Sequence, residues 1–566
     1  MTARDLSCLD WEDKLRAGKP PIREGLPIDI ASGDRAVRAF NMLRLADVPG
    51  APRMSEAGGE WFRIIMRAMF GAIDPVTRER WLRELFLLVP KKNSKTTNGA
   101  LMMLTALLLN ARPAAKFVMT APVQDVAEIA FEAARGAIEL DPVLSKKMHV
   151  RQHLKSITHR ETRATLEIMT FDPDVLTGQK ISGGALIDEL HMVAKMTKAA
   201  AAIRQIRGGM LPFPEAFLAF ITTQSDGPPV GVFKAELAKA RAVRDGRHRG
   251  AMLPVLYELP DAIRKHRDEW KNPKHWELVT PNAGRSISIP RLVEDFETAV
   301  AAGEDELRGW ASQHLNLEIG LALRSDRWVG ADFWESAARP GLDLDALIER
   351  SEVICVGIDG GGLEDLLGLS VIGRDRETRE WLTWSRAWVH RSMLDRRKQE
   401  AAQLQDFAED GDLVLVDEVG ADTAELAEIV ARIYASGKMN AGEPEKPTPM
   451  IGLDPVGVGA ILEALVQAGI PQALVIGISQ GWKLNAAIKT AERKLAEGVL
   501  VHGGQPLMAY SLSNARVEQK GNAVVITKQA SGAGKIDPLM ALFDAVSLMA
   551  LNPEPPSAPE YHLTFV

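Results

Sequence analysis

The feature that most constrains the fold is an alternation of short apolar runs with longer amphipathic segments across residues 60–255. Each apolar run ends in polar or turn-forming residues, and a segment with helical periodicity separates it from the next run. Short runs that are apolar throughout indicate strands buried on both faces, as in parallel sheets covered by helices. The expected strands are 85–89, 116–120, 165–171, 184–187 and 216–221, and the clearest expected helices are 98–110, 123–140 and 199–206. This order predicts an α/β domain with a mostly parallel sheet.

A second alternation begins near residue 353 in a different order. Three strands are expected in succession at 353–358, 367–372 and 381–388, followed by helix 391–409, strand 412–416, helix 423–436, strand 450–453, helix 458–468, strand 473–476 and helix 483–497. A three-strand meander followed by α/β units is the order of a ribonuclease-H-like mixed sheet. We therefore expect a lead-in at 1–54, a first α/β domain at 55–255, a helical linker subdomain at 256–350 and a second α/β domain at 351–566.

Composition excludes several classes of protein. Hydrophobic residues make up 46% of the chain and charged residues 25%, as in soluble globular proteins. The net charge of −7 gives no overall attraction to nucleic acid, so any DNA contact needs local basic patches. Two cysteines argue against a disulfide framework. The first residues lack the apolar run of a signal peptide, and no apolar run is long enough to span a bilayer, so we expect no secretion and no membrane.

The junction between the first expected strand and its helix carries three lysines, in the order Lys-Lys-Asn-Ser-Lys-Thr-Thr. A strand, a loop ending in Lys-Thr and a helix form the context of a phosphate-binding loop, in which backbone N–H groups at the helix start favour an anion. Lys95 would reach the β- and γ-phosphates of ATP, and Thr96 would hold Mg²⁺. The usual pattern has glycine at the positions of Val89 and Ser94, so a lysine-rich surface turn is the alternative. The expected ATP-binding residues here are Lys91, Asn93, Ser94, Lys95, Thr96 and Thr97.

Two later strand ends add polar groups to the same predicted sheet. Strand 184–187 runs into Asp188 and Glu189. Asp188 can hold the water shell of Mg²⁺, and Glu189 can orient or deprotonate an attacking water. The strand at 216–221 ends in Thr222, Thr223 and Gln224, which can sense the γ-phosphate and relay its loss. Ordinary solvated strand ends are the alternative for each. Together with the loop they predict a P-loop ATPase domain at 55–255, with Arg135, Arg204 and Arg207 as candidate transition-state arginines.

The second domain predicts a cluster of carboxylates. Asp359 ends the first strand of the meander and is followed by three glycines, Asp454 ends a later strand, and Asp537 opens the last helix with Asp544 two turns further on. Single aspartates at strand ends are usually turn formers. In a ribonuclease-H-like sheet, however, these ends are neighbours, and converging carboxylates repel one another unless a cation lies between them. Two Mg²⁺ or Mn²⁺ ions would serve, activating water and stabilising the leaving oxygen of a phosphodiester.

An ATPase sheet followed by a metal nuclease of this kind resembles the large terminase subunit of tailed bacteriophages over roughly residues 55–555. Residues 90–96 resemble the family's phosphate loop Pro-Arg-x-Asn-Gly-Lys-Ser, with Ser94 in place of its last glycine. "LIDELH" resembles its acidic strand end and "TTQS" its coupling motif. "KIDPLMAL" resembles the family's Lys-Ile-Asp-Gly-x-x-Ala, and this match favours Asp537 over Asp544 as the third metal ligand. The resemblance also implies a second acidic residue near Asp359, for which we expect Asp365.

The resemblance implies a DNA-packaging motor. Such a protein hydrolyses ATP to translocate double-stranded DNA into a procapsid and cuts concatemeric DNA with a metal-dependent endonuclease. It implies a ring of copies on the portal protein, a small terminase subunit as partner, and the host cytoplasm as location. Candidate phosphate contacts are Arg241, Arg244, Arg247, His248, Arg249, Lys528 and Lys535. The alternatives are a stand-alone ATP-dependent nuclease of DNA repair or defence, and a nucleotide-binding scaffold protein with decayed sites.

Overall fold

The computed structural model describes residues 5–74, 76–77, 79–196, 198–318, 328–362, 365–396, 398–440, 442–443, 446–455, 458–520, 523–528 and 535–556. The chain forms two compact units, residues 1–319 and 320–566, and each is described by itself. The division falls inside the stretch expected as a linker subdomain, since residues 256–318 pack within the first unit. The four-part division of the chain stays a prediction.

The first unit is built on an eight-stranded sheet with strand order β3-β4-β5-β2-β6-β7-β1-β8. From β5 to β8 all neighbours are parallel, whereas β3, β4 and β5 pair antiparallel at one edge. The predicted mostly parallel sheet is confirmed, while the antiparallel edge and β8 had not been predicted. The strands are β1 (Glu84–Leu88), β2 (Lys116–Ala121), β3 (Met148–Arg151), β4 (Ser156–His159), β5 (Thr165–Thr170), β6 (Gly184–Asp188), β7 (Phe217–Thr222) and β8 (Met252–Leu256).

Helices cover this sheet, and its central strands are buried along their whole length. Helix α5, which follows the lysine-rich junction, is buried almost throughout, and Gly99 lets it approach Leu186 and Ile221 of the sheet. The helices of the unit are α1 (Trp11–Arg16), α2 (Ile30–Met42), α3 (Met54–Ala57), α4 (Glu60–Gly71), α5 (Lys95–Leu108), α6 (Gln124–Glu139), α7 (Pro142–Lys147), α8 (Pro173–Thr177), α9 (Leu190–Val193), α10 (Ala199–Met210), α11 (Gly231–Arg244), α12 (Asp261–Arg264), α13 (Arg267–Trp270), α14 (Ile289–Ala302) and α15 (Glu304–Leu315).

The second unit contains a mixed sheet in the order β12-β11-β10-β9-β15-β16, with β17 also pairing with β11. The meander β9-β10-β11 is antiparallel, whereas β12, β15, β16 and β17 join in parallel. This confirms the predicted mixed sheet of a ribonuclease-H-like domain. The strands are β9 (Ser351–Gly360), β10 (Leu367–Asp375), β11 (Trp381–His390), β12 (Leu413–Val416), β15 (Ile451–Leu453), β16 (Val475–Gly477) and β17 (Leu500–His502). Two separate antiparallel pairs are β13 (Gly442–Glu443) with β14 (Lys446–Pro447) and β18 (Ala515–Lys520) with β19 (Ala523–Lys528).

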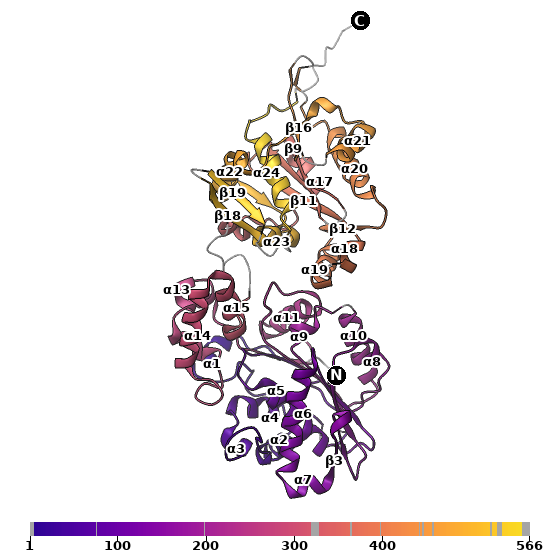
Figure 1. Cartoon of the computed structure of the whole chain (residues 1–566), viewed down its shortest axis with the longest axis vertical. Coiled ribbons are helices and arrows are strands. Elements are labelled where there is room, and N and C mark those ends of the chain that lie inside the picture. Colours follow the sequence, from indigo (N-terminus) through magenta and orange to yellow (C-terminus); the bar gives the residue numbers. More distant parts are fainter. Residues whose placement is uncertain are drawn as a thin grey trace. The chain divides into compact units, whose positions relative to one another are not determined.

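The last helix of this unit lies directly on the sheet because three strand residues lack side chains. A Cβ at Gly357 would come 1.9 Å from Ala541 O, one at Gly368 2.7 Å from Asp537 C, and one at Gly452 3.3 Å from Asp544 O. Helix α24 therefore packs against β9, β10 and β15. The helices are α16 (Ala331–Trp334), α17 (Leu344–Arg350), α18 (Ser392–Arg396), α19 (Lys398–Glu409), α20 (Ala421–Ala435), α21 (Gly459–Gln467), α22 (Asn485–Ala496), α23 (Pro506–Asn514) and α24 (Asp537–Met549) (Figure 1).

Among the described residues, no helix combines the length and the apolar character needed to cross a membrane. Cys8 and Cys355 are both buried, and each is a free thiol.

Candidate active sites

The loop before α5 adopts a backbone conformation that its own residues do not favour. Lys92 and Ser94 have φ angles of 68° and 56°, in the left-handed region where glycine is the usual residue. Ser94 is the N-cap of α5, so the free N–H groups of the first helical turn begin immediately after it. Asn93 braces the loop from within by donating its Nδ2 to Pro90 O at 3.0 Å. A helix start presented in this way suits an anion.

The acidic strand end meets this loop across the carboxyl edge of the sheet. Lys95 Nζ lies 2.8 Å from Glu189 Oε1, and Thr96 Oγ1 donates to Asp188 Oδ2 at 2.6 Å. Parallel β6 ends close to α5 because β6, β7 and β1 are successive neighbours in the sheet. Two residue pairs that are far apart in sequence are thus brought into contact, as the motifs predicted.

The pKa values of the two carboxyl groups, Asp188 and Glu189, are shifted in opposite directions. Burial raises the pKa of Asp188 to about 7, and the charge of Glu189 adds to this rise. Burial also acts to raise the pKa of Glu189, but the charge and hydrogen bond of Lys95, with the charge of Lys91, outweigh it and hold that pKa below its usual value. Glu189 therefore remains ionised at neutral pH beside its lysine. An ionised, oriented carboxylate of this kind can accept a proton from water.

The end of β7 contributes the predicted coupling residues and one residue that sequence reasoning missed. His191 Nδ1 lies 3.0 Å from Thr222 Oγ1 and 3.4 Å from Glu189 Oε2, so it links the two strand ends. Burial lowers the pKa of His191 to about 4, which keeps the ring neutral. The only signal in the sequence was its place in "LIDELH". Thr223 Oγ1 and Gln224 Nε2 are buried and have no hydrogen-bond partner within the described residues.

Residues near the end of the first unit hold the same loop and strand end. Lys91 donates from its backbone N to Gln313 O at 2.8 Å and from Nζ to Gln313 Oε1 at 2.7 Å. Gln224 N donates to Asn316 Oδ1 at 3.1 Å, just after α15. Lys91 therefore anchors the loop to α15 in this structure. Thr97 lies half-buried in the first turn of α5.

Two of the predicted nuclease carboxylates leave adjacent strands in register. The parallel pairing of β9 and β15 aligns Ile358 with Leu453, so that Asp359 and Asp454 follow side by side. Asp454 N donates to Ile358 O at 3.3 Å across this strand end. The expected neighbourhood of these two residues is therefore present.

Helix α24 brings both of its aspartates to this edge. Burial, together with the charges of Asp359 and Asp454, raises the pKa of Asp544 to about 9, so the three carboxyl groups share one electrostatic environment. Gln480, also missed from the sequence, donates Nε2 to Asp544 Oδ1 at 3.3 Å. Asp537 lies beside Gly360, where its Oδ1 is 3.0 Å from the position of a Cβ.

The other predicted ligand has a different partner. Asp365 Oδ1 accepts from the buried Lys535 Nζ at 2.6 Å. Glu364, beside it, lies outside the described residues. Across the described part of the chain, no three His, Cys, Asp or Glu side chains are grouped closely enough to hold a metal ion. The metal ligand set therefore stays a prediction.

Several candidate cations are engaged inside the fold. Arg207 pairs with Glu84 and Glu236, and Arg135 with the Glu132 and Glu139 of its own helix. The side chain of Arg204, in contrast, is exposed to solvent. In the basic stretch that begins in the last turn of α11, Arg241 and Arg244 both bind the buried Glu258, while His248 and Arg249 are exposed. The side chain of Lys528 lies outside the described residues.

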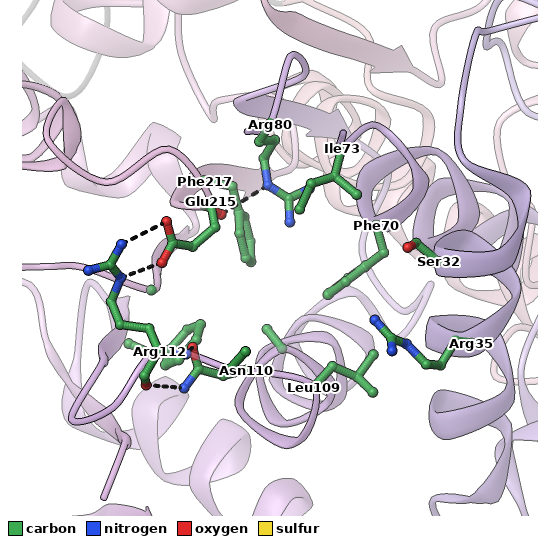
Figure 2. A pocket seen from close by; sticks show the side chains of 14 residues that line it. Ser32, Arg35, Phe70, Ile73, Arg80, Leu109, Asn110, Arg112, Glu215 and Phe217 are labelled. Carbon is green, nitrogen blue, oxygen red and sulfur yellow. Dashed lines mark hydrogen bonds and ion pairs between the residues drawn. The ribbon is translucent and has the colours of Figure 1, made fainter. Parts of the chain in front are cut away.

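A cavity of about 90 Å³ lies at the opposite, amino edge of the first sheet (Figure 2). Figure 2 shows Arg112 and Arg80 directed at Glu215, with Phe217 between them. Arg112 forms two hydrogen bonds to the Glu215 carboxylate, and Arg80 Nε donates to Glu215 O at 3.1 Å. Because a volume of about 90 Å³ is too small for a nucleotide, the carboxyl edge is the better candidate for a nucleotide.

Comparison with known proteins finds a family model for each of two successive parts of the chain. The family model "Terminase large subunit, ATPase domain" matches residues 60–228, and "Terminase large subunit, endonuclease domain" matches residues 256–552. A curated terminase large subunit from Lactococcus phage p2 is 25% identical over 311 residues, which are 53% of this chain and 52% of the relative. The match thus spans about half the length of that relative.

Solved structures of phage terminases are also similar. The large terminase of bacteriophage HK97 is 18% identical, with 91% of this chain and 99% of that one covered and a TM-score of 0.45. A large terminase from a thermophilic bacteriophage, solved in complex with ADP, is 13% identical, with 84% and 96% covered and a TM-score of 0.30. The large terminase nuclease of the thermophilic phage G20c with bound magnesium is 16% identical, with 40% and 98% covered and a TM-score of 0.26. These likenesses carry no argument about function. On the two family matches, which together account for most of its length, the chain belongs to the terminase large subunit family, with an ATPase domain followed by an endonuclease domain.

Proposed function

We propose that this chain is a viral DNA-packaging motor that hydrolyses ATP to translocate double-stranded DNA into a procapsid and cuts concatemeric DNA with a metal-dependent endonuclease. One observation carries the proposal. The same polypeptide holds Lys95 and Thr96 against an acidic strand end, and separately holds Asp359 and Asp454 in register under an acidic helix. The comparisons give no support to a stand-alone repair nuclease.

In the ATPase domain, the chain's own groups would bind and orient MgATP. The first turn of α5 and Lys95 would bind the phosphates, with Lys91, Asn93, Ser94 and Thr97 forming the rest of the loop. Thr96 and Asp188 fit Mg²⁺, because a hydroxyl and a carboxylate already meet there and oxygen donors are what Mg²⁺ prefers. The ion would neutralise charge on the phosphates. Glu189, ionised and held by Lys95, would accept a proton from the attacking water.

Coupling of hydrolysis to movement would run through the end of β7. Thr222 is joined through His191 to the acidic strand end. Thr223 and Gln224 each bury a polar atom that has no hydrogen-bond partner within the described residues, and a γ-phosphate or its water would satisfy them. Gln224 is joined in turn to Asn316, near the end of the first unit. Loss of the γ-phosphate would therefore affect Asn316, which precedes the nuclease domain in the sequence.

In the nuclease domain, Asp359, Asp454 and Asp537 would hold two Mg²⁺ or Mn²⁺ ions, with Asp544 and Asp365 as further candidates. The carboxylate donors fit such ions, and burial together with the charges of Asp359 and Asp454 raises the pKa of Asp544 at this edge, which supports the proposal. The ions would activate water and stabilise the leaving oxygen of a phosphodiester. Gln480 would orient Asp544. Lys535, buried against Asp365, would hold that carboxylate in place.

The partners would be double-stranded DNA, a small terminase subunit and the portal protein of the procapsid. A homo-oligomeric ring would form on the portal, from monomers in solution, in the host cytoplasm. Phosphate contacts in DNA would come from exposed side chains such as His248 and Arg249, since Arg241 and Arg244 are engaged internally.

The test is to measure ATP turnover and Mg²⁺-dependent cleavage of linear DNA by the full chain, with and without purified portal and procapsid. We expect both activities, and ATP turnover that increases with portal and DNA. A wild-type chain that neither hydrolyses ATP nor cuts DNA would overturn the proposal. Turnover indifferent to portal and procapsid would point instead to a nuclease that acts alone.

A further inference from the structure

Asn282 lies outside the ATPase motifs and makes direct contact with the phosphate loop. It lies between η2 (Pro273–Leu278) and α14, and only 4% of it is exposed. Its backbone N donates to Asn93 Oδ1 at 3.0 Å, and its Nδ2 approaches Ser94 Oγ at 3.3 Å. The loop of the ATPase motif is therefore held from a segment roughly 190 residues further along the chain.

The orientation of the Asn282 amide is fixed by its other neighbours. Trp61 Nε1 donates to Asn282 Oδ1 at 3.0 Å, and an indole N–H can only donate, so the oxygen must face Trp61. The amide nitrogen is thereby turned toward Ser94 and Ser286, whose Oγ it meets at 2.8 Å. Ser286 Oγ in turn donates to Lys92 O. Both amide hydrogens and the amide oxygen are used, so the side chain has one arrangement.

The phosphate loop has a particular need for such support. Lys92 and Ser94 are both in the left-handed region, which costs a residue other than glycine about 1 to 2 kcal/mol. The usual loop pattern places glycine at the position of Ser94, and glycine adopts this conformation without strain. Serine brings strain, but it also brings a hydroxyl that glycine lacks. That hydroxyl, the carbonyl of Lys92 and the amide oxygen of Asn93 are the loop groups that the Asn282–Ser286 pair contacts.

We infer that Asn282 is a positioning residue for ATP: through Asn93 and Ser94 it holds the phosphate loop in its anion-binding conformation and replaces the conformational freedom of the missing glycine. This inference rests on the proposed ATPase function. It assigns to residues 282–286 a direct part in nucleotide affinity. It also explains how the loop keeps the left-handed conformation with serine at position 94.

The test is a double-mutant cycle on the full chain, comparing wild type, Asn282→Ala, Ser94→Gly and the double variant. Dissociation constants for MgATPγS and the kcat and KM of ATP turnover are measured for each. Losing hydrogen bonds worth about 1 kcal/mol each predicts nucleotide binding weaker by on the order of tenfold in Asn282→Ala. With glycine at 94 the loop needs less support, so the same change should cost clearly less. Equal losses in both backgrounds, or wild-type affinity in Asn282→Ala, would overturn the inference.

Two controls keep the result interpretable. Asn272→Ala removes an amide from the same region, where its Oδ1 accepts from Lys274 N instead, and it should leave nucleotide affinity unchanged. Circular dichroism and thermal unfolding of the full chain, compared with wild type, report whether the first unit of Asn282→Ala folds. If that variant does not fold, Ser94→Ala removes only the hydroxyl, and it must weaken nucleotide binding for the inference to stand. If the wild-type chain binds no ATP, the proposed function itself is wrong. If wild type binds ATP and Asn282→Ala binds it equally well, only this inference is wrong.

Discussion

Lys95 and Glu189 form a buried ion pair, with 2.8 Å between Nζ and Oε1, across the carboxyl edge of the first sheet. Their side chains are 7% and 15% exposed, so the pair is largely removed from water. Lys95 cannot bind Glu189 at this distance and also give its charge fully to a phosphate. The proposed ATP cycle therefore includes an exchange of partner by Lys95, which leaves the Glu189 carboxylate available to water.

Replacing Glu189 by glutamine should separate binding from hydrolysis. The amide keeps the shape of the side chain but cannot accept a proton as the carboxylate does, so kcat should fall by about 10²- to 10⁴-fold. Nucleotide affinity should stay the same or rise, because Lys95 loses a competing negative charge. ATP turnover and MgATPγS binding measure the two effects. Lys95→Ala is the contrasting variant and should lose binding; normal turnover in Glu189→Gln would remove that residue from its role.

Asp359→Asn should abolish metal-dependent DNA cleavage and leave ATP turnover intact. Asp359 and Asp454 leave neighbouring strands in register, so loss of one carboxylate removes a shared ligand from the proposed metal site. The first unit has its own sheet and its own site. Cleavage of linear DNA and ATP hydrolysis are measured on the same preparation. Undiminished cutting by this variant would refute the site.

Asp544→Asn should stabilise the metal-free protein while weakening its affinity for Mn²⁺. Burial, with Asp359 and Asp454, raises the pKa of Asp544 to about 9, so the native state holds a proton that the unfolded state releases above its ordinary pKa. This group's contribution to stability is fully present at low pH and is lost as pH rises toward 9. The advantage of the variant in chelator should therefore grow with pH, to on the order of a few kcal/mol.

Titration with Mn²⁺ can decide which of the two aspartates of α24, Asp537 or Asp544, is the third metal ligand. Calorimetric Mn²⁺ binding by Asp544→Asn and Asp537→Asn is compared with that of Asp359→Asn. The variant that loses as much affinity as Asp359→Asn identifies the third ligand. Wild-type affinity in both would exclude α24 from the metal site.

Gly357→Ala should damage the nuclease domain without touching any carboxylate. A Cβ at this position would lie 1.9 Å from Ala541 O, so α24 would have to move away from β9. Overpacking of this kind costs about 1 to 3 kcal/mol or more, and the shift would also displace Asp537 and Asp544. Thermal unfolding and DNA cleavage test this. Gly459→Ala is the matched control, since nothing lies within 4 Å of a Cβ there; equal stability of the two variants would contradict the prediction.

Acid should destabilise the first unit partly through His314. Burial lowers the pKa of His314 to about 4, and the charges of Lys91 and Lys92 add to this while Asp295 opposes it. Below pH 6.5 His314 binds a proton in the unfolded chain but stays neutral in the native protein. The free energy of unfolding therefore falls as pH drops toward 4. His314→Phe keeps a ring against Trp310 and removes this titration. Relative to the variant, wild type should lose about 2 kcal/mol between pH 7 and pH 5; a parallel change in both contradicts the assignment.

The sequence by itself determined the order and type of most elements near the sites. Apolar runs such as 184–187 and 216–221 became β6 and β7 because a strand buried on both faces has few alternatives. The meander at 353–388 could be predicted equally well, since its three strands follow one another in the sequence and a clear turn joins the second to the third. Asp359 and Asp454 could be paired in advance because both end apolar strands and carboxyl ends of neighbouring strands meet.

Only the tertiary structure decided which distant groups touch. No local pattern indicates that Asn282 holds Ser94, that Gln480 meets Asp544, or that Arg241 and Arg207 are neutralised inside the fold. The antiparallel β3–β4 edge was also missed, because short strands at a sheet edge lack the continuous apolar signal of buried ones. Secondary structure follows from periodicity along the chain, which a sequence displays directly. Contacts between polar side chains depend on how layers pack and which glycines allow close approach, and these are properties of the folded whole.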